Sequence, residues 1–270
     1  MTKLGPTSTG QEVRFACRRG EWTDHTAGLA DQFAQANLVI LPSEQAADFR
    51  RFCERNLQPC PLLEMTQPGD PVPHMMAADA DIRTDLPRYR IWRHGEVTDE
   101  PTEITGLWRD DFVSFLIGCS YTFDAALIQA GLPVRHIEEG CNVPMYRTNI
   151  ECQSAGLFSG PLVVSMRPFQ AADIVRADEL TARFPHFHGR PVHHGDPHGI
   201  GIADISQPDF GDAVPVHANE TPVFWACGVT PQCALESARL PLAITHAPGH
   251  MFVTDRSNTD ILRSTGTTST

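Results

Sequence analysis

A chain of 270 residues can bury a sizeable core and is long enough for one large α/β domain with a smaller one beside it. Its formal net charge of -12, without any block rich in Lys and Arg, argues against a nucleic acid or an anionic membrane as a partner. Eight scattered cysteines without a C-x-x-C pair, no apolar leader and no run of about 18 apolar residues predict a cytoplasmic protein with reduced thiols.

The first part of the chain predicts a buried strand between two helices. Residues 11–20 have a short amphipathic helical pattern, and the apolar run 35–41 is typical of a buried strand that ends at Pro42. Ser43 suits the N-cap of a helix that continues to Asn56. A strand followed at once by a helix indicates the start of an α/β unit.

The middle of the chain mixes short strands and helices. Gly131, with Pro133 just beyond it, ends one of these helices, and the turn at His94-Gly95 indicates a hairpin. The predicted elements are a proline-rich loop at 59–73 that holds a short strand at 62–65, a hairpin at 89–97, a helix at 108–116, a helix at 123–130, and strands at 134–138 and 145–150.

The last part predicts further strands around a long loop. Thr230 as N-cap and Pro231 in the first turn give a helix a well-defined start. The predicted elements are a strand at 161–166, a helix at 171–183, a His- and Gly-rich connection at 184–212, a strand at 222–227, a helix at 230–239, and strands at 242–245 and 251–254.

The stretch 135–150 is the first candidate for an active-site loop. It gathers acids, amides, arginines, a histidine and a thiol in sixteen residues, a mixture that rarely serves packing alone. Glu138 or Glu139 could act as a general acid or base if buried, although both also suit solvated positions. Neighbouring residues on a strand face opposite ways, so at most one of the two can face the site.

Two arginines and two turns could bind an anionic substrate. Arg147 and Arg167 could each hold a carboxylate and together suit a small diacid, although either could instead form a structural salt bridge. Free backbone N–H groups are expected where helices begin near Ser120-Tyr121 and near Gly228-Thr230. Cys119, beside the first turn, could be a nucleophile, but a small buried thiol is the commoner role. No G-x-G-x-x-G or Walker sequence is present, so a cofactor-free site is expected.

The histidines supply a further set of candidate groups. His246 and His250 flank a tight turn between two strands and are candidates for proton transfer, because histidine titrates near neutral pH. The spacing H-x-x-x-H with Pro248 and Gly249 inside it is not that of a helical zinc pair, so no metal ligand is assigned there. The histidines and acids of 186–217 still leave a divalent metal site open as an alternative.

Several long motifs resemble the hydro-lyase family related to D-glutamate cyclase, and the resemblance extends from about Arg14 to Asp255. The motifs are G-E-W-T, Q-A-N-L-V-I-L-P, P-C-P-L-L-E, D-L-P-R-Y-R, R-H-I-E-E-G-C-N-V-P-M-Y-R-T-N-I, F-S-G-P-L-V-V-S-M-R-P, G-D-P-H-G-I-G-I, P-V-F-W-A-C-G-V-T-P-Q and I-T-H-A-P-G-H-M-F-V-T-D. The resemblance implies a lyase, in the animal relative one that cyclises D-glutamate to 5-oxo-D-proline with loss of water. It also implies an α/β fold, a three-layer α/β/α sandwich from 1–149 and 229–270 with a smaller two-layer α+β subdomain at 150–228.

The residues above can be fitted to that chemistry. Glu139 or His246 could accept the ammonium proton, and His250 could donate a proton to the leaving oxygen. The predicted substrate-binding residues are Ser120, Tyr121, Asn142, Arg147, Asn149, Arg167, Gly228 and Thr230.

The expected partner is therefore a small-molecule carboxylate substrate, with a homo-oligomer left open. Two alternatives remain at this point, a non-catalytic carboxylate-binding protein and a metal-dependent dehydratase of a hydroxy acid. The site hypothesis makes a spatial prediction that 135–150, Arg167 and the turn 246–250 line one cleft.

Overall fold

A large antiparallel sheet forms the centre of the computed structural model, which describes residues 4–258 and 260. Within those residues the sheet has seven strands in the order β2-β5-β1-β10-β3-β4, with β11 also paired to β1. Its strands are β1 (Phe33–Pro42), β2 (Leu62–Met65), β3 (Tyr89–Arg93), β4 (Glu96–Asp99), β5 (Phe112–Gly118), β10 (Ala243–His246) and β11 (Phe252–Ser257).

Alternation along β1 divides the core of this sheet into two layers. Val39 and Leu41 pack on one face, while Leu38 and Ile40 pack on the other, as the period of two in a strand requires. All four side chains are fully buried. Because β1 is apolar on both faces and pairs with β5, β10 and β11, it is the central strand of the protein.

A second, smaller sheet is formed by strands from the later half of the chain. Its order is β6-β7-β9-β8, and all of its pairings are antiparallel. The strands are β6 (Met145–Glu151), β7 (Pro161–Gln170), β8 (His193–His194) and β9 (Glu220–Ala226). The sheet spans 145–226, close to the predicted subdomain at 150–228, and the division into two domains itself stays a prediction.

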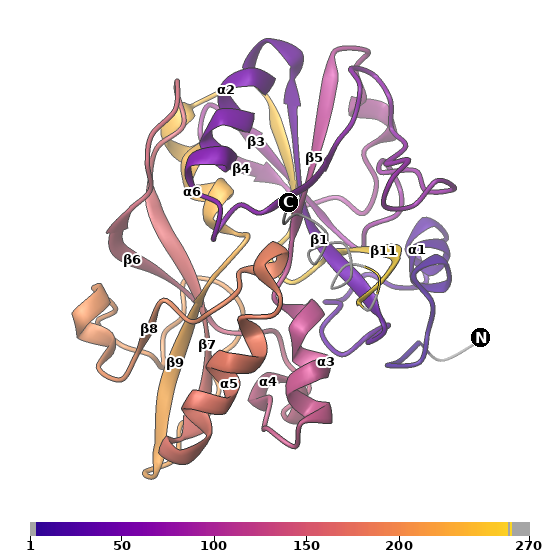
Figure 1. Ribbon diagram of the computed structural model, residues 1–270. Helices are drawn as coiled ribbons and strands as arrows, with labels where there is room; N and C mark the ends of the chain where they lie inside the picture. The colour runs from indigo at the N-terminus through magenta and orange to yellow at the C-terminus, as the bar shows by residue number, and fades with distance from the viewer. Residues whose placement is uncertain (1–3, 259, 261–270) are drawn as a thin grey trace, which may run out of the picture.

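Helices cover both sheets, with α2 and α6 in one group, α3, α4 and α5 in another, and α1 apart from both beside β11 (Figure 1). Phe49 and Leu235 bring α2 and α6 onto one face of the large sheet, and Phe123 and Ala177 bring α3 and α5 onto Trp225 of β9. The helices are α1 (Gly10–Arg18), α2 (Ser43–Arg55), α3 (Tyr121–Gln129), α4 (Arg135–Glu138), α5 (Ile174–Thr181) and α6 (Thr230–Ala238), with single 3-10 turns η1 (Thr105–Leu107), η2 (Ala171–Asp173), η3 (Pro185–Phe187) and η4 (Pro197–Ile200).

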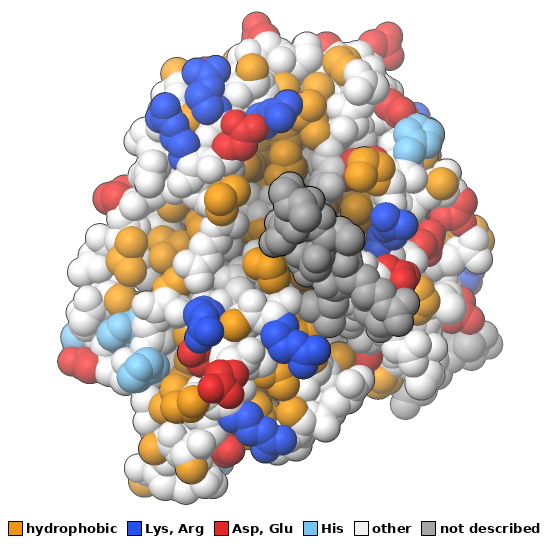
Figure 2. Space-filling view, viewed as in Figure 1, with side chains coloured by type: hydrophobic (Ala, Val, Ile, Leu, Met, Phe, Trp, Pro, Cys, Tyr) orange, Lys and Arg blue, Asp and Glu red, His pale blue; other side chains and the backbone are white. Residues whose placement is uncertain are grey.

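The predicted α/β class is confirmed, since the chain mixes helices with antiparallel sheets. On the face seen in Figure 2, basic and acidic side chains are interspersed. None of the helices in the described residues is long and apolar enough to cross a membrane.

Most predicted elements are confirmed, but the helix predicted at 108–116 is wrong. This region contains a strand, β5, which pairs with β1 on one side and β2 on the other. All seven of its residues are buried. The apolar residues Phe112, Phe115 and Leu116 imitate helical spacing, and a short apolar run buried on both faces has no alternation to reveal it. Trp108 lies outside the strand and packs edge-on against Phe112.

The strand predicted at 134–138 is also wrong, because a single helical turn, α4, occupies it. One turn is too short to show a period of 3.6 residues in the sequence. The helical turn places Arg135 and Glu138 side by side, with Nε and Oε2 3.1 Å apart. Glu138 and Glu139 are therefore not on opposite faces of a strand, and both are exposed.

Candidate active site

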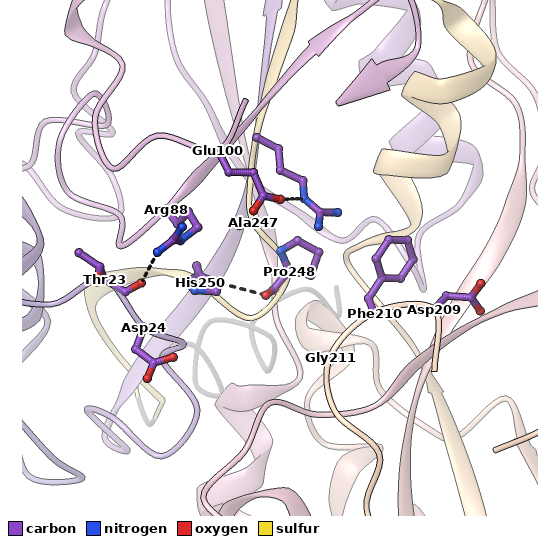
Figure 3. A pocket seen from close by; sticks show the side chains of 11 residues that line it. Thr23, Asp24, Arg88, Glu100, Asp209, Phe210, Gly211, Ala247, Pro248 and His250 are labelled. Atoms are coloured by element: carbon purple, nitrogen blue, oxygen red, sulfur yellow. Dashed lines mark hydrogen bonds and ion pairs between the residues drawn. The ribbon is translucent and has the colours of Figure 1, made fainter. Parts of the chain in front are cut away.

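A pocket of about 600 Å³ opens where the β3 and β10 end of the large sheet faces a segment that follows β8 in sequence. Figure 3 shows its lining side chains. They are Thr23, Asp24, Arg88, Arg90, Glu100, Asp209, Phe210, Gly211, Ala247, Pro248 and His250.

Two arginines on β3 and just before it supply the positive charge of the pocket. Arg88 and Arg90 flank the buried Tyr89, so the alternation of the extended chain turns both of them to the same side. Arg90 is already fixed, with Nε 2.6 Å from an oxygen of Glu100 and Nη1 3.2 Å from the side-chain oxygen of Gln232.

Arg88 differs from Arg90 because its charge is not neutralised by the protein. In the part of the chain that the structure describes, its guanidinium forms no ion pair, and its one hydrogen bond is a 3.5 Å contact to the Thr23 carbonyl (Figure 3). A guanidinium that is half-buried and lacks a carboxylate partner is suited to bind an anionic ligand in two-pronged fashion.

His250 can accept a proton from a ligand in this pocket. Its Nδ1 lies 3.0 Å from the Pro248 carbonyl oxygen, and since a carbonyl only accepts, Nδ1 carries the hydrogen. The lone pair is therefore on Nε2. Burial lowers the pKa of His250, aided by Arg88 and His25 and opposed by the Pro248 carbonyl and by Asp24, so the ring is neutral at pH 7.

His246 has an environment that does not favour proton transfer. It is fully buried on β10, where its Nδ1 contacts the backbone of Leu38, and it does not line the pocket. Burial lowers its pKa to about 3, which makes it a weak base at neutral pH. Of these two histidines, His250 lines the pocket and His246 does not.

Asn142 and Tyr121 lie directly behind the turn that carries His250. The hydroxyl of Tyr121 donates to Oδ1 of Asn142 at 2.6 Å, and Nδ2 of Asn142 donates to the Pro248 carbonyl at 3.0 Å. Tyr121 also stacks on His136, with ring centroids 5.8 Å apart. The structure thus brings two predicted substrate-binding residues to the predicted turn, but it engages their polar atoms with protein groups.

Arg167 is buried in an ion pair and is not free to bind a substrate. Its Nε and Nη2 lie 2.7 and 2.9 Å from the two carboxylate oxygens of Asp124. Nη1 and Nη2 also donate to the hydroxyls of Ser165 and Ser120 at 3.1 Å. Nε2 of His136 lies 3.3 Å from the same carboxylate. Because His136 also stacks on Tyr121, it links the Arg167–Asp124 ion pair to Tyr121.

Arg147 does not line the pocket of His250, but it contacts two residues that do, with its Nε 3.8 Å from Asp209 and its guanidinium over the ring of Phe210. Arg147 forms a two-pronged pair with Glu236, both distances being 2.6 Å, in a separate pocket of about 490 Å³. Glu139 and Asn149 are exposed and do not line the pocket of His250.

The second predicted anion-binding turn is filled by protein atoms. A Cβ on Gly228 would lie 2.0 Å from the side-chain nitrogen of Asn37, so no space for a ligand remains on that side. The Thr230 hydroxyl donates to the Cys227 carbonyl at 2.7 Å, and the Thr230 amide donates to the same carbonyl. At the first turn, burial raises the pKa of the Cys119 thiol well above its ordinary value, which disfavours a nucleophile.

The candidate metal ligands are not assembled. Within residues 4–258 and 260, no three side chains of His, Cys, Asp or Glu come together in a way that could hold a metal ion.

Arg88 and Arg90 are absent from the predicted site residues, although the sequence contains a signal for them. D-L-P-R-Y-R places two arginines two positions apart at the start of a predicted hairpin strand, a spacing that turns both to one side. No pattern indicated which side faces a pocket, because that depends on β10 and on the segment 209–211.

Comparison with known proteins identifies the family of the chain. A solved structure, a nitrogen repressor-like protein from Methanococcus jannaschii, aligns with 96% of this chain and 98% of its own, but at 10% identity and a TM-score of 0.41 it supports no argument. Close relatives with provisional hydro-lyase names are found in three bacteria. The protein from Bordetella pertussis is 59% identical over 96% of this chain and 93% of its own length. The proteins from Geobacillus kaustophilus and Bacillus licheniformis are 56% identical over 94% of this chain and 97% of the relative, and 60% identical over 90% of this chain and 93% of the relative, respectively. These names support a lyase, and the profile described as D-glutamate cyclase matches residues 113–255. The chain belongs to the D-glutamate cyclase family.

Proposed function

We propose that the protein is a hydro-lyase that acts on a small carboxylate in the pocket of His250, and that it cyclises D-glutamate to 5-oxo-D-proline with loss of water. The observation that supports this most is the pairing, in one pocket, of an unneutralised guanidinium, Arg88, with a neutral imidazole, His250, whose Nε2 carries a lone pair. Membership in the D-glutamate cyclase family supports the same reaction.

The charges of the pocket favour an amino acid over a hydroxy acid. Arg88 offers a positive charge for a carboxylate and Asp24 a negative charge for an ammonium group. The carboxylate of Asp209 is already engaged by Arg147, whose backbone N–H donates to Oδ2 at 2.8 Å and whose Nε lies 3.8 Å from Oδ1. Glu100 already neutralises Arg90, so the remaining charges are of both signs. A zwitterionic amino diacid complements such a pocket better than a substrate without an amine.

The reaction follows from these groups without net gain or loss of protons. His250 Nε2 takes one proton from the substrate ammonium, and the freed amine attacks the distal carboxyl carbon, forming the C–N bond. Hydrogen bonds from Nη2 of Arg90 stabilise the charge that develops on the carboxyl oxygen, since Glu100 and Gln232 hold the guanidinium in place through Nε and Nη1. The C–O bond then breaks, and the proton on His250 together with a second proton from the amine leaves with that oxygen as water.

The test is turnover by the purified protein. Incubation with D-glutamate, L-glutamate and D-2-hydroxyglutarate in separate reactions, followed by chiral chromatography with mass spectrometry, measures each dehydrated product. We expect 5-oxo-D-proline from D-glutamate, at a rate far above the spontaneous cyclisation measured without protein. Binding of D-glutamate in calorimetry without product would contradict the proposal and support a carboxylate-binding protein.

A further inference from the structure

The carbonyl oxygen of Pro248 accepts hydrogen bonds from two side chains, and one of these bonds fixes the orientation of the His250 ring. Nδ1 of His250 lies 3.0 Å from this oxygen, and Nδ2 of Asn142 lies at the same distance. Asn142 is buried and comes from the loop before β6, far from the turn in sequence. The orientation of the imidazole therefore depends on a residue outside the turn.

Only one orientation of the Asn142 side-chain amide satisfies both of its hydrogen-bond partners. A carbonyl oxygen only accepts, so Nδ2 must face Pro248, and the Tyr121 hydroxyl at 2.6 Å then donates to Oδ1. The amide also fills the space beside Gly249, whose φ is +85°, and a Cβ there would lie 2.3 Å from Nδ2. The hydroxyl of Tyr121 thus prevents the amide from rotating.

Asn142 also connects to the opposite wall of the pocket. Its backbone N–H donates to a carboxylate oxygen of Asp212 at 2.9 Å, and the Asp212 N–H donates back to the Asn142 carbonyl at 3.3 Å. Asp212 directly follows Gly211, which lines the pocket together with Phe210. One residue therefore contacts both the turn that carries the base and the segment that faces it.

We propose that Asn142 is a positioning residue, which through the Pro248 carbonyl holds His250 in the tautomer with the proton on Nδ1 and the lone pair on Nε2. Its importance for turnover rests on the proposed function, whereas its effect on the tautomer does not. Asn142 itself does not bind the substrate, since both polar atoms of its side chain are engaged within the protein.

Other charged and titratable groups around His250 also influence its ring. His246 is on the preceding strand, His25 and Asp24 are on the loop before β1, and Arg88 is on the approach to β3. None of these groups determines which nitrogen carries the hydrogen, because the nitrogen that faces Pro248 must donate. The tautomer therefore tests the role of Asn142 separately from the charges.

The experiment is ¹⁵N NMR of the histidine rings in the full chain at pH 8, with the His250 signals assigned by their loss in His250→Gln. The variants are Asn142→Ala, Tyr121→Phe, which keeps the stacked ring and removes only the hydroxyl, and the matched control Gln153→Ala, which removes an exposed amide. We expect the Nδ1–H tautomer of His250 in wild type and control, and a mixture of tautomers in both other variants, larger in Asn142→Ala.

Turnover supplies the second readout. In Asn142→Ala we expect kcat to fall by between about tenfold and a hundredfold with KM changed by less than about twofold, because the base is misplaced while Arg88 is intact. If Asn142→Ala does not fold, Tyr121→Phe decides. An unchanged His250 tautomer in the folded variants overturns the proposal. A wild-type protein with the expected tautomers but no turnover of D-glutamate overturns the proposed function and leaves the positioning role of Asn142 standing.

Discussion

Replacing Arg167 by methionine distinguishes a structural role from a substrate-binding role. The side chain is fully buried, and it holds Asp124 through two short hydrogen bonds of 2.7 and 2.9 Å. Methionine fills much of the same space but leaves the buried carboxylate without its guanidinium partner, with His136 3.3 Å away. Breaking a buried ion pair in this way costs about 3–5 kcal/mol of the free energy of unfolding.

The size of that loss should depend on pH. Burial alone would raise the pKa of Asp124, but Arg167 and His136 outweigh it, and the pKa lies below its ordinary value. In the wild type this carboxylate therefore stabilises the fold above its unfolded pKa of about 4, and the stabilisation is lost as the pH falls through the lower folded value. Without Arg167, burial raises the pKa of Asp124, so the deficit of the variant is largest at pH 7 and shrinks toward pH 4.

Urea unfolding of wild type, Arg167→Met and the double variant Arg167→Met/Asp124→Leu at pH 7 and pH 5 measures these differences. The double variant should regain a large part of the lost stability, since an apolar pair of similar volume often replaces a buried ion pair at little cost. A single variant as stable as wild type at both values of pH, with a raised KM, would refute the structural role and restore Arg167 as a ligand of the substrate.

Three further predictions concern the pocket and its surroundings. His250→Gln should lower kcat by about a hundredfold or more. In wild type, kcat/KM should fall on the acid side with a midpoint below the ordinary histidine pKa of about 6.5, because burial lowers the pKa of His250. A pH profile of kcat/KM that is flat from 5 to 8 would contradict this. Gly249→Ala should cost about 1–3 kcal/mol in urea unfolding, because its φ of +85° disfavours a side chain and the new Cβ meets Asn142; wild-type stability would show that the turn is not constrained. Arg147→Met should cost about 1 kcal/mol at most and leave KM unchanged, because its pair with Glu236 is about one-third exposed; a tenfold rise in KM would show that Arg147 binds the substrate.

Strands whose ends carry turn signals could be predicted from the sequence, and the buried strand β5 could not. Pro42 and the residues before it, and the run 222–227 before Gly228, gave strands that the structure confirms as β1 and β9. β5 failed because the groups that bury its two faces, such as Phe49 of α2 on one side and Ile82 on the other, come from distant segments that no local pattern shows. The single turn of α4 failed for want of length.

The candidate site shows a similar limit of local patterns. Unusual residue types marked the turn 246–250 and the stretch 135–150 as candidates, and the structure brings Asn142 of that stretch to Pro248 of the turn. What could not be predicted is which charges are neutralised. Arg167 and Arg88 look alike in the sequence, but Arg167 meets Asp124 from a distant helix, whereas Arg88 meets no carboxylate among the described residues.

The proposed function depends above all on Arg88 binding the substrate in the pocket of His250. Its most direct test is kcat/KM for D-glutamate cyclisation in Arg88→Met beside the matched control Arg93→Met, which removes an exposed arginine of β3 that does not line the pocket. Loss of one charge-assisted contact predicts a fall of about tenfold to a hundredfold in Arg88→Met, chiefly through KM, with the control unchanged. An Arg88→Met protein within about twofold of wild type would contradict the account.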